Sequence, residues 1–385
     1  MKPLNIGINL AGLLPGVSGG IEFYIRNLLD ALGKIDAENQ YLLFTNRDNH
    51  HTFDSNNHNF KRILCNLSGY TKVRRVAWEQ FFSPFTLKKY RLDLLHSPTY
   101  TWPVASKIPG VVSILDMLYY VYPEFIPQPK LSFLRVLVPW SARRCRKVLT
   151  ISESSKRDIV RFLGISPEKV TVTPLALDRR LDIGRVPTEV EIEKVCSKFG
   201  IRRPYILNVG AVGNNKNPFA LLDALEILHE KFSMNNLSLV ISGNDYGAAS
   251  GIWSRVAASG LRDFVCLPGY VPSEYLPALY AGALAYVSPS FFEGFGLTLL
   301  EAMAFGTPVV TSDRGSLPEV AGEAALFVNP DRPDQIADSV FQVATTPEIR
   351  KDLVDRGRQR VLEFSWERTA RLTLEAYLEA VARPG

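Results

Sequence analysis

The chain has 385 residues, which is too long for one ordinary hydrophobic core and predicts two domains. Hydrophobic residues make up 46% of the sequence and charged residues 22%, as in a globular protein and unlike a disordered or membrane-embedded one. The formal net charge of +5 is too small to indicate a nucleic-acid partner, although it would favour an anionic ligand or surface.

The cysteines and the N-terminal residues indicate the cellular compartment in which the protein is expected. The chain has four scattered cysteines without a Cys-x-x-Cys pair, which predicts free core thiols and a reducing cytoplasm: Cys65, Cys145, Cys196 and Cys266. The apolar run near the N-terminus is short and predicts a first strand, not a signal peptide. No stretch reaches the roughly 18 apolar residues that a membrane-spanning helix needs.

Strand-like and helical patterns alternate through the first half, residues 1–180. Apolar positions in 21–34 have the spacing of a helix. Strands are predicted at residues 6–10, 41–45, 92–96, 111–116, 148–152 and 170–177.

A charged segment, 181–204, breaks this rhythm and is predicted to be a linker with one exposed helix. The pattern then resumes over 205–365, with strands predicted at residues 205–210, 237–242, 264–267, 283–287, 308–311 and 325–328. Residues 366–385 begin with an amphipathic helix. Strands that alternate with helices predict α/β domains with parallel sheets, and a ligand cleft between the two domains at the carboxyl ends of their strands.

The segment 288–301 reads Ser-Pro-Ser-Phe-Phe-Glu-Gly-Phe-Gly-Leu-Thr-Leu-Leu-Glu and is the most informative in the chain. It places Glu293 and Glu301 eight positions apart across a Gly-rich turn, between a predicted strand and a predicted helix at 297–305. Backbone N–H groups at a helix start suit a phosphate. Carboxylates accept hydrogen bonds from the hydroxyl groups of a sugar and a ribose. We therefore predict a sugar-nucleotide site, although both acids could also simply stabilise the helix start.

In each half of the chain, the loop after the first strand is also informative. Gly19 and Gly20 end a Gly/Pro-rich loop and predict either close backbone approach to a phosphate or sugar, or a tight turn that starts a helix. Lys216, in the loop 210–217, precedes Asn217 and Pro218, which resemble a helix N-cap and first helical position. Lys216 could meet a diphosphate there or be a solvated surface lysine, and beside the acidic turn we favour the first.

Basic and aromatic residues are mixed in two stretches of the first half. One is 143–147, which follows the apolar segment 131–140. The other, 70–91, contains Lys72, Arg74, Arg75, Lys88, Lys89 and Arg91 with Trp78, Phe81, Phe82 and Phe85. This mixture suits an anionic bilayer surface, and it also suits a buried helix face with solvated charges.

The acidic turn carries a family resemblance. Glu-x7-Glu within Ser-x-x-Glu-Gly-Phe-Gly-Leu, followed by Leu-Leu-Glu-Ala-Met-Ala-x-Gly-Thr-Pro-Val-Val, resembles the retaining GT-B glycosyltransferases of family 4. Further matching pieces extend the resemblance over nearly the whole chain: Gly19-Gly20, Tyr122-Pro-Glu124, 150–155, 269–271 and 364–366. The resemblance implies two Rossmann-like domains that face each other across a cleft, with the last helix crossing back onto the first domain.

The same resemblance implies roles for individual residues. Glu301 would hold the ribose, Glu293 would face the donor sugar, and Lys216 would pair with the diphosphate. The implied catalytic set is Glu293, Lys216 and Asp116. The implied nucleotide-sugar site comprises Gly19, Gly20, Gly210, Asn215, Lys216, Gly269, Tyr270, Val271, Glu293, Gly294, Phe295, Gly296, Leu297 and Glu301.

Two positions depart from the family pattern. Leu115 precedes Asp116 where the family usually has His-Asp, and Asn215 precedes Lys216 where it usually has Arg-Lys. An asparagine cannot replace the charge or the fork geometry of an arginine. One lost charge-assisted contact would cost roughly 1.5–3 kcal/mol.

The expected activity is retaining transfer of a hexose, without a metal ion, from a nucleotide-sugar to a growing polysaccharide or lipid-linked glycan. A UDP-sugar is the favoured donor, with GDP-mannose next; the nucleotide-sugar is a substrate, so no cofactor is expected. The expected location is the cytoplasm, with peripheral attachment to the membrane as an option. The alternatives are a sugar-nucleotide-binding protein that has lost catalysis and, more distantly, a dinucleotide-dependent oxidoreductase. The second would be expected to have a Gly-x-Gly-x-x-Gly fingerprint after the first strand, and this chain lacks one.

Overall fold

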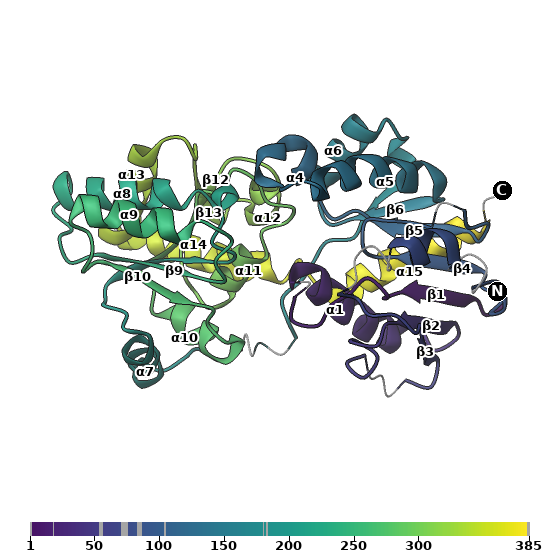
Figure 1. Ribbon diagram of the computed structural model, residues 1–385. Helices are drawn as coiled ribbons and strands as arrows, with labels where there is room; N and C mark the ends of the chain where they lie inside the picture. Colours follow the sequence, from purple (N-terminus) through teal and green to yellow (C-terminus); the bar gives the residue numbers. More distant parts are fainter. Residues whose placement is uncertain are drawn as a thin grey trace. The chain divides into compact units, whose positions relative to one another are not determined.

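The chain forms two compact units, shown as a ribbon in Figure 1. Unit 1 comprises Met1–Leu175 with Ser365–Gly385, and unit 2 comprises Ala176–Phe364. The computed structural model describes residues 2–17, 19–53, 57–70, 76–82, 87–103, 105–179, 181 and 184–382, with the backbone alone at Phe81 and Phe82.

The described part of unit 1 contains a seven-stranded parallel sheet of order β3-β2-β1-β4-β5-β6-β7. The strand order reverses between β1 and β4. The strands are β1 (Asn5–Asn9), β2 (Gln40–Thr45), β3 (Phe60–Leu64), β4 (Leu94–Ser97), β5 (Gly110–Ser113), β6 (Lys147–Thr150) and β7 (Val170–Val172). The six strands predicted in this half are confirmed, and β3 is additional.

Helices cover both faces of this sheet. The predicted helix at 21–34 is confirmed as α1, which buries Tyr24, Leu28 and Leu32. The helical segments with bounds in the described part of unit 1 are α1 (Gly19–Ile35), η1 (Trp78–Phe82), α4 (Leu118–Val121), η2 (Pro123–Phe125), α5 (Lys130–Arg144), α6 (Glu153–Leu163), η3 (Pro167–Lys169) and α15 (Trp366–Ala382).

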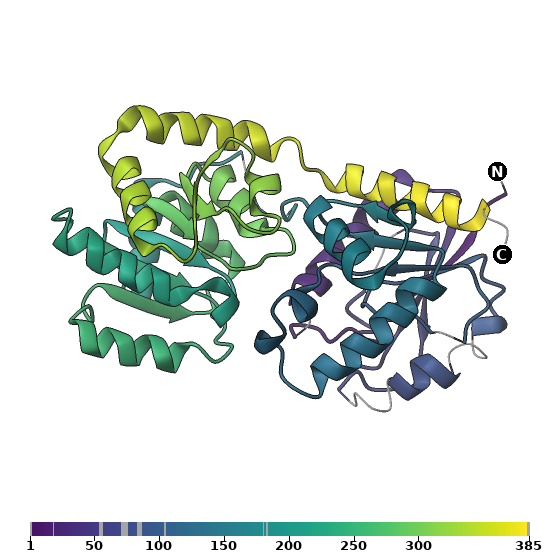
Figure 2. The same cartoon turned by 90° about the horizontal axis from the view of Figure 1, so that it is seen from above.

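The C-terminal helix α15 packs on unit 1, as the family resemblance implied, and lies along it in Figure 2. It contacts α1 and strands β4 to β7. Its Tyr377 hydroxyl is 2.7 Å from Nδ1 of the buried His96 in β4. Arg146 donates a hydrogen bond of 2.8 Å to the carbonyl of Ala380. The helix is therefore held by buried polar contacts as well as by apolar packing.

The described part of unit 2 repeats the same architecture, with a six-stranded parallel sheet of order β10-β9-β8-β11-β12-β13. All six strands predicted for this half are confirmed. The strands are β8 (Tyr205–Val209), β9 (Ser238–Ser242), β10 (Val265–Gly269), β11 (Ala285–Ser288), β12 (Val309–Ser312) and β13 (Ala325–Val328). The strand order reverses between β8 and β11.

The helices of unit 2 close a core made by apolar residues of β8, β9, β11, α8 and α13. The helical segments are α7 (Glu189–Phe199), η4 (Asn214–Lys216), α8 (Pro218–Glu230), α9 (Ala249–Ser259), η5 (Ser273–Tyr275), α10 (Leu276–Ala281), α11 (Leu297–Ala304), α12 (Leu317–Ala321), α13 (Pro333–Thr345) and α14 (Pro347–Val361).

The segment predicted to be a linker contains α7, and this helix is more buried than expected. Ile192, Val195 and Cys196 form its buried side, and it packs against α10. Its charged residues occupy the other faces, which is why composition alone made it resemble an exposed helix. A capping box between Thr188 and Glu191 fixes its start.

The prediction of free thiols is confirmed at all four cysteines. Cys65, Cys145 and Cys196 are buried as expected, and Cys266 is partly exposed. No helix in the described ranges is long and apolar enough to cross a membrane.

Candidate functional site

Unit 2 brings together two loops that the sequence presents separately. The loop 210–217 follows β8 and the acidic turn follows β11, and these two strands are neighbours where the strand order reverses. In open parallel sheets, ligands bind outside the carboxyl ends of the strands at this switch point. The N–H of Phe291 donates to the carbonyl of Asn215 at 2.9 Å and joins the loops directly.

An ion pair spans the two loops. Lys216 Nζ contacts Glu293 Oε1, and the two side chains are only 17% and 14% exposed. Ser290 Oγ donates to the same carboxylate oxygen at 2.9 Å. Because both side chains are largely shielded from water, their attraction is stronger than that of an exposed pair. The ion pair therefore fixes a positive and a negative group together at the switch point.

The turn before α11 has a backbone that requires glycine. Gly296, the N-cap of α11, has φ 102°, and no side chain caps the helix. A Cβ at Gly296 would lie 2.8 Å from Leu317 Cδ2, so a larger residue would have to displace this buried side chain and strain the backbone. Ser316 Oγ lies 2.8 Å from the carbonyl oxygens of both Glu293 and Phe295 and braces the turn.

The amino end of α11 is consequently suited to an anion. Within the part of the chain that the structure describes, the N–H groups of Phe295, Gly296 and Leu297 have no protein acceptor. Uncapped N–H groups and the positive end of the helix macrodipole together stabilise a phosphate. Gly294 precedes these residues in the same turn.

Glu301 lies further along the same helix and is largely enclosed. The Tyr280 hydroxyl donates to its Oε2 at 2.7 Å. Burial raises the pKa of Glu301 to about 7, the charge of Asp178 also raises it, and the Tyr280 hydrogen bond opposes the rise. The carboxyl therefore changes charge near neutral pH.

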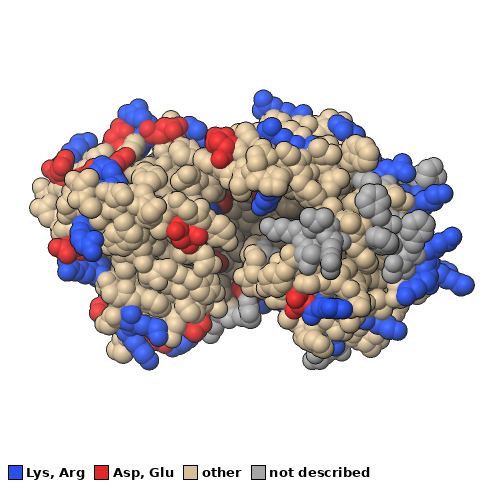
Figure 3. Space-filling model, in the orientation of Figure 1, with Lys and Arg blue, Asp and Glu red and all other residues tan. Residues whose placement is uncertain are grey.

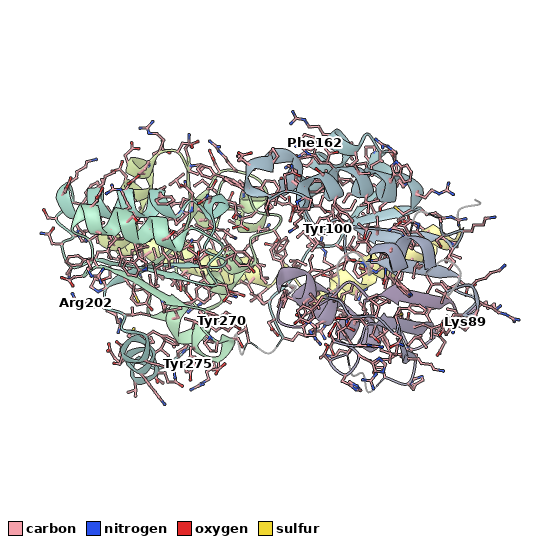
Figure 4. All side chains as sticks on the ribbon, in the orientation of Figure 1. Lys89, Tyr100, Phe162, Arg202, Tyr270 and Tyr275 are labelled. Atoms are coloured by element: carbon pink, nitrogen blue, oxygen red, sulfur yellow. The ribbon has the colours of Figure 1, made fainter. Side chains whose placement is uncertain are left out.

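The remaining predicted residues of unit 2 lie beside β8 and β10. Gly210 has φ 139° and packs closely on Gly243. A Cβ at Gly243 would lie 1.6 Å from the Gly210 carbonyl oxygen. Gly269 ends β10, and the next side chain, Tyr270, is 64% exposed (Figure 4). Val271 is 3% exposed, and a contact between it and a nucleotide base remains a prediction.

The predicted residues of unit 1 form a separate group. Gly19 and Gly20 begin α1, and no atom lies within 4 Å of a Cβ built at either position. Gly19 has φ 50°, a conformation that glycine adopts readily. Asp116 accepts hydrogen bonds from the Leu118 N–H at 3.0 Å and the Tyr100 hydroxyl at 3.2 Å. The surroundings of the glycines are those of a helix start, and close approach to a phosphate remains a prediction.

The sequence did not indicate the cavity beside Asp116. Its volume is about 460 Å³, and it lies at the carboxyl ends of β1, β4 and β5, where the strand order of unit 1 reverses. Polar residues, including Thr99, Tyr100 and Thr101, line one part of it. Residues of α5 line another: Lys130, Phe133 and Leu134. The polar run Thr99-Tyr100-Thr101, two positions after the buried strand β4, was the available signal.

The described residues contain no group of three or more His, Cys, Asp or Glu side chains that could hold a metal ion. In the basic stretch 70–91, Trp78 and Tyr90 pack against the cluster around Phe44, Leu95 and Trp102. Lys88, Lys89 and Arg91 are exposed. Lys72, Arg74, Arg75, Phe85 and the side chains of Phe81 and Phe82 lie outside the described residues.

Two family descriptions match consecutive parts of the chain. "Glycosyltransferase Family 4" matches residues 18–181, and "Glycosyl transferases group 1" matches residues 192–360. The O-antigen chain mannosyltransferase B of Escherichia coli is 32% identical over 305 residues, covering 79% of this chain and 77% of the relative. The MMP alpha-(1->4)-mannosyltransferase of Mycolicibacterium hassiacum is 33% identical over 246 residues, covering 63% and 56%.

Solved structures agree on the fold. A sucrose-phosphate synthase from Thermosynechococcus elongatus aligns with a TM-score of 0.75 at 20% identity, covering 98% of each chain. Anabaena HepE, solved with UDP and glucose, aligns with a TM-score of 0.74 at 17% identity, covering 97% of this chain and 98% of that one. Both alignments show that the fold is of the GT-B type. The chain belongs to glycosyltransferase family 4, the group 1 glycosyl transferases, and the oxidoreductase alternative is thereby wrong.

Proposed function

We propose that this glycosyltransferase moves mannose from a nucleotide-sugar to a growing polysaccharide or lipid-linked glycan, with retention of the anomeric configuration and without a metal ion. The observation that carries the proposal is the Lys216–Glu293 pair beside the uncapped amino end of α11. A cation and backbone N–H groups suit a diphosphate, and the adjacent carboxylate suits sugar hydroxyls.

The choice of mannose is supported by the names of relatives. Relatives from Escherichia coli, Mycolicibacterium hassiacum and Salmonella typhimurium are all named as mannosyltransferases. We therefore place GDP-mannose ahead of a UDP-hexose as the donor. The exposed Tyr270 ring would neighbour the nucleotide base and could stack on either a purine or a pyrimidine. This side chain therefore does not distinguish a GDP-sugar from a UDP-sugar.

The proposed mechanism assigns charge stabilisation to fixed groups. As the bond between the sugar and the diphosphate breaks, negative charge grows on the leaving phosphate. Lys216 and the N–H groups of Phe295, Gly296 and Leu297 are already oriented, so they stabilise this charge with little reorganisation. The departing phosphate oxygen accepts the proton of the acceptor hydroxyl, which attacks from the same face. Glu293 positions the sugar and forms no covalent bond with it.

We assign the acceptor to the cavity in unit 1. Its polar part, with Asp116, Tyr100 and Thr101, suits sugar hydroxyls, and its α5 side, with Phe133 and Leu134, suits an apolar group. A glycan, or a glycan on a lipid carrier, combines these properties. The free thiols fit the proposal that the reaction takes place in the cytoplasm.

One rival function has specific support. Leu115 is 6% exposed and apolar where a histidine is usual, and Asn215 carries no charge where an arginine is usual. A protein that binds a nucleotide-sugar without transferring it would tolerate both changes. Release of nucleoside diphosphate by the purified chain separates an enzyme from such a binding protein.

The test measures nucleoside diphosphate release and sugar transfer with GDP-mannose, UDP-glucose and UDP-galactose, with and without EDTA. We expect turnover with GDP-mannose that EDTA leaves unchanged, and a product whose anomeric NMR signal matches the configuration of the donor. Donor binding without release of diphosphate would favour the rival. Absence of binding by all three donors would contradict the proposed function itself.

A further inference from the structure

Helix α5 presents an apolar and basic stripe to solvent. Val136, Trp140 and Arg144 are spaced by four residues and therefore lie on one face of the helix, with Arg143 beside them. Val136 is 60% exposed and Trp140 is 58% exposed. The exposed tryptophan and valine lie next to each other on this face, with two exposed arginines at its end, so apolar and cationic groups are combined on one surface.

The opposite side of α5 fixes this orientation. Leu131, Val138 and Ala142 belong to the core of unit 1. Arg143 donates a hydrogen bond of 3.1 Å to the carbonyl of Leu163 at the end of α6. Because one side of the helix is packed in the core, the stripe cannot rotate inward without exposing that core.

Stacked cations and rings extend the basic surface beside the stripe. The Arg135 guanidinium lies 5.4 Å from the Tyr120 ring, and Tyr120 stacks on Phe162 with ring centroids 5.2 Å apart. Arg161 lies 5.2 Å from the other ring of this stack, Phe162. Figure 4 labels Phe162 at the edge of unit 1 where α5 and α6 lie, and Figure 3 shows Lys and Arg side chains along that edge.

The local charge is one-sided. From 130 to 147 the sequence contains no Asp or Glu, and it contains Lys130, Arg135, Arg143, Arg144, Arg146 and Lys147. The last two are turned toward α15, since Arg146 bonds the Ala380 carbonyl and Lys147 pairs with Glu379. The other four side chains are exposed, although Arg143 also bonds the Leu163 carbonyl and Arg135 lies over the Tyr120 ring. A partner that covers this face should therefore be negatively charged and should accept a tryptophan.

We propose that the outer face of α5 docks on an anionic lipid bilayer. Trp140 and Val136 enter the boundary between headgroups and acyl chains, where tryptophan is favoured. The exposed arginines and Lys130 meet the anionic headgroups. A long cationic side chain can keep its stem in the apolar layer while its charge stays in water.

Docking through α5 would bring the unit 1 cavity close to the bilayer surface. The same helix lines the unit 1 cavity with Phe133, Leu134 and Lys130. A lipid-anchored acceptor would then reach the cavity without leaving the bilayer surface. This second step rests on the proposed function, whereas docking itself requires only the surface of α5.

The test is co-sedimentation of the full-length protein with vesicles, without any nucleotide. Vesicles of phosphatidylcholine alone are compared with vesicles that contain about one third phosphatidylglycerol. The variants are Trp140→Ala and the double variant Arg143→Gln with Arg144→Gln. The matched control is Trp253→Ala, because Trp253 is 38% exposed on α9 of unit 2 and also lies beside an arginine, Arg262.

We expect binding to the anionic vesicles only. Loss of each arginine should weaken it about fivefold, so the double variant should bind roughly 25-fold more weakly. Trp140→Ala should also weaken binding, and Trp253→Ala should bind as the unaltered protein does. Thermal stabilisation by nucleoside diphosphate, measured on every variant, shows that each is folded and reports on the donor site separately.

Three results would overturn the proposal. The first is equal sedimentation with neutral and anionic vesicles. The second is equal binding by the Trp140→Ala variant and the unaltered protein, since this would indicate a surface for soluble polyanions such as nucleic acid. The third is equal weakening by Trp253→Ala. Failure of vesicle binding with intact nucleotide binding would reject the docking surface and leave the proposed function standing.

Discussion

Lys216 and Glu293 are separated by 77 positions in the sequence and meet because β8 and β11 are adjacent strands. Each side chain alone would pay the cost of leaving water, and the contact between them offsets that cost. The same contact places the ammonium group beside the N–H groups of the turn. A single side chain thus serves both the loop structure and the proposed diphosphate site.

Replacing Lys216 by alanine tests this double role. We expect nucleoside diphosphate to bind about 10- to 100-fold more weakly, because a charge-assisted hydrogen bond contributes roughly 1.5–3 kcal/mol. Calorimetric titration measures the dissociation constant, and transfer assays measure turnover. Lys231→Ala is the control, since Lys231 forms a largely exposed ion pair with Asp338. Equal binding by the Lys216→Ala variant and the unaltered protein would remove Lys216 from the site.

Glu301 makes stability depend on pH. Its pKa is raised from an ordinary 4.5 to about 7, so the folded state retains a proton that the unfolded state loses between these values. The contribution of this group to stability therefore falls as pH rises from about 4.5 to about 7. Urea unfolding of the Glu301→Gln variant should show a flatter dependence over this range, by on the order of 2–3 kcal/mol.

The control for that experiment is Glu323→Gln, because the Glu323 side chain is 91% exposed. An unchanged pH profile in the Glu301→Gln variant would show that this carboxyl titrates normally in the folded protein.

At the level of single residues, the sequence indicated the acidic turn but could not predict its contacts. Glu293, the glycines and the helix start are adjacent in the chain, so local spacing revealed them. The ion pair with Lys216 depends on strand order, which no local pattern contains. Tyr280, which bonds Glu301, and Ser316, which braces the turn, come from other helices and loops and carried no signal of their own.

Among the elements, α15 is joined to β4 by a buried polar contact. His96 bonds the Tyr377 hydroxyl through Nδ1 and Ser113 Oγ, at 2.8 Å, through Nε2. Tyr377→Phe should lower the free energy of unfolding by about 1–3 kcal/mol, because a buried ring nitrogen loses its partner. Urea unfolding at pH 7 measures this loss. The control is Tyr70→Phe, at a ring that is 63% exposed, and an equally small effect of both variants would contradict the expectation.

The same histidine predicts acid sensitivity. Burial lowers the pKa of His96 from 6.5 to about 3, so the unfolded chain binds a proton that the folded protein does not. The contribution of this group to stability is present above pH 6.5 and is lost as the pH falls toward 3. A His96→Gln variant should lose less stability between pH 7 and pH 4 than the unaltered protein. Parallel stability curves would contradict this assignment.

Strands with a mainly apolar sequence were predictable, and elements rich in charged residues were not. Most of the predicted strands are short apolar runs with buried side chains. By contrast, β3 reads Phe-Lys-Arg-Ile-Leu and lies at the sheet edge, beside β2 only, so its composition resembles a loop. The burial of helix α7 was missed for a related reason. Three buried residues provide its packing, and most of its other residues are charged.

At the scale of the whole molecule, unit 1 carries the strand order of unit 2 with one additional strand, β7, at its edge. The repeat gives each unit a switch point, with the cavity in unit 1 and the ion-paired loops in unit 2. The alternation of strands and helices predicted this architecture, since right-handed crossovers leave few other arrangements. The strand order itself came only with the structure.

Ligand binding should stabilise the full chain selectively. At a concentration about 100 times its dissociation constant, a donor nucleotide adds roughly 2.7 kcal/mol to the stability of the state that binds it. We expect thermal denaturation to shift upward with GDP and GDP-mannose, by several degrees, and much less with ADP. Equal shifts with all nucleotides would contradict selection of the base and leave binding of the diphosphate intact.

The most direct measurement is a crystal structure of the chain with GDP-mannose or its non-transferable analogue. The diphosphate should lie on the N–H groups of Phe295, Gly296 and Leu297 within reach of Lys216, with the sugar toward Glu293 and the ribose toward Glu301. Density for the ligand elsewhere, with this turn in contact only with water, would contradict the assignment of the donor site.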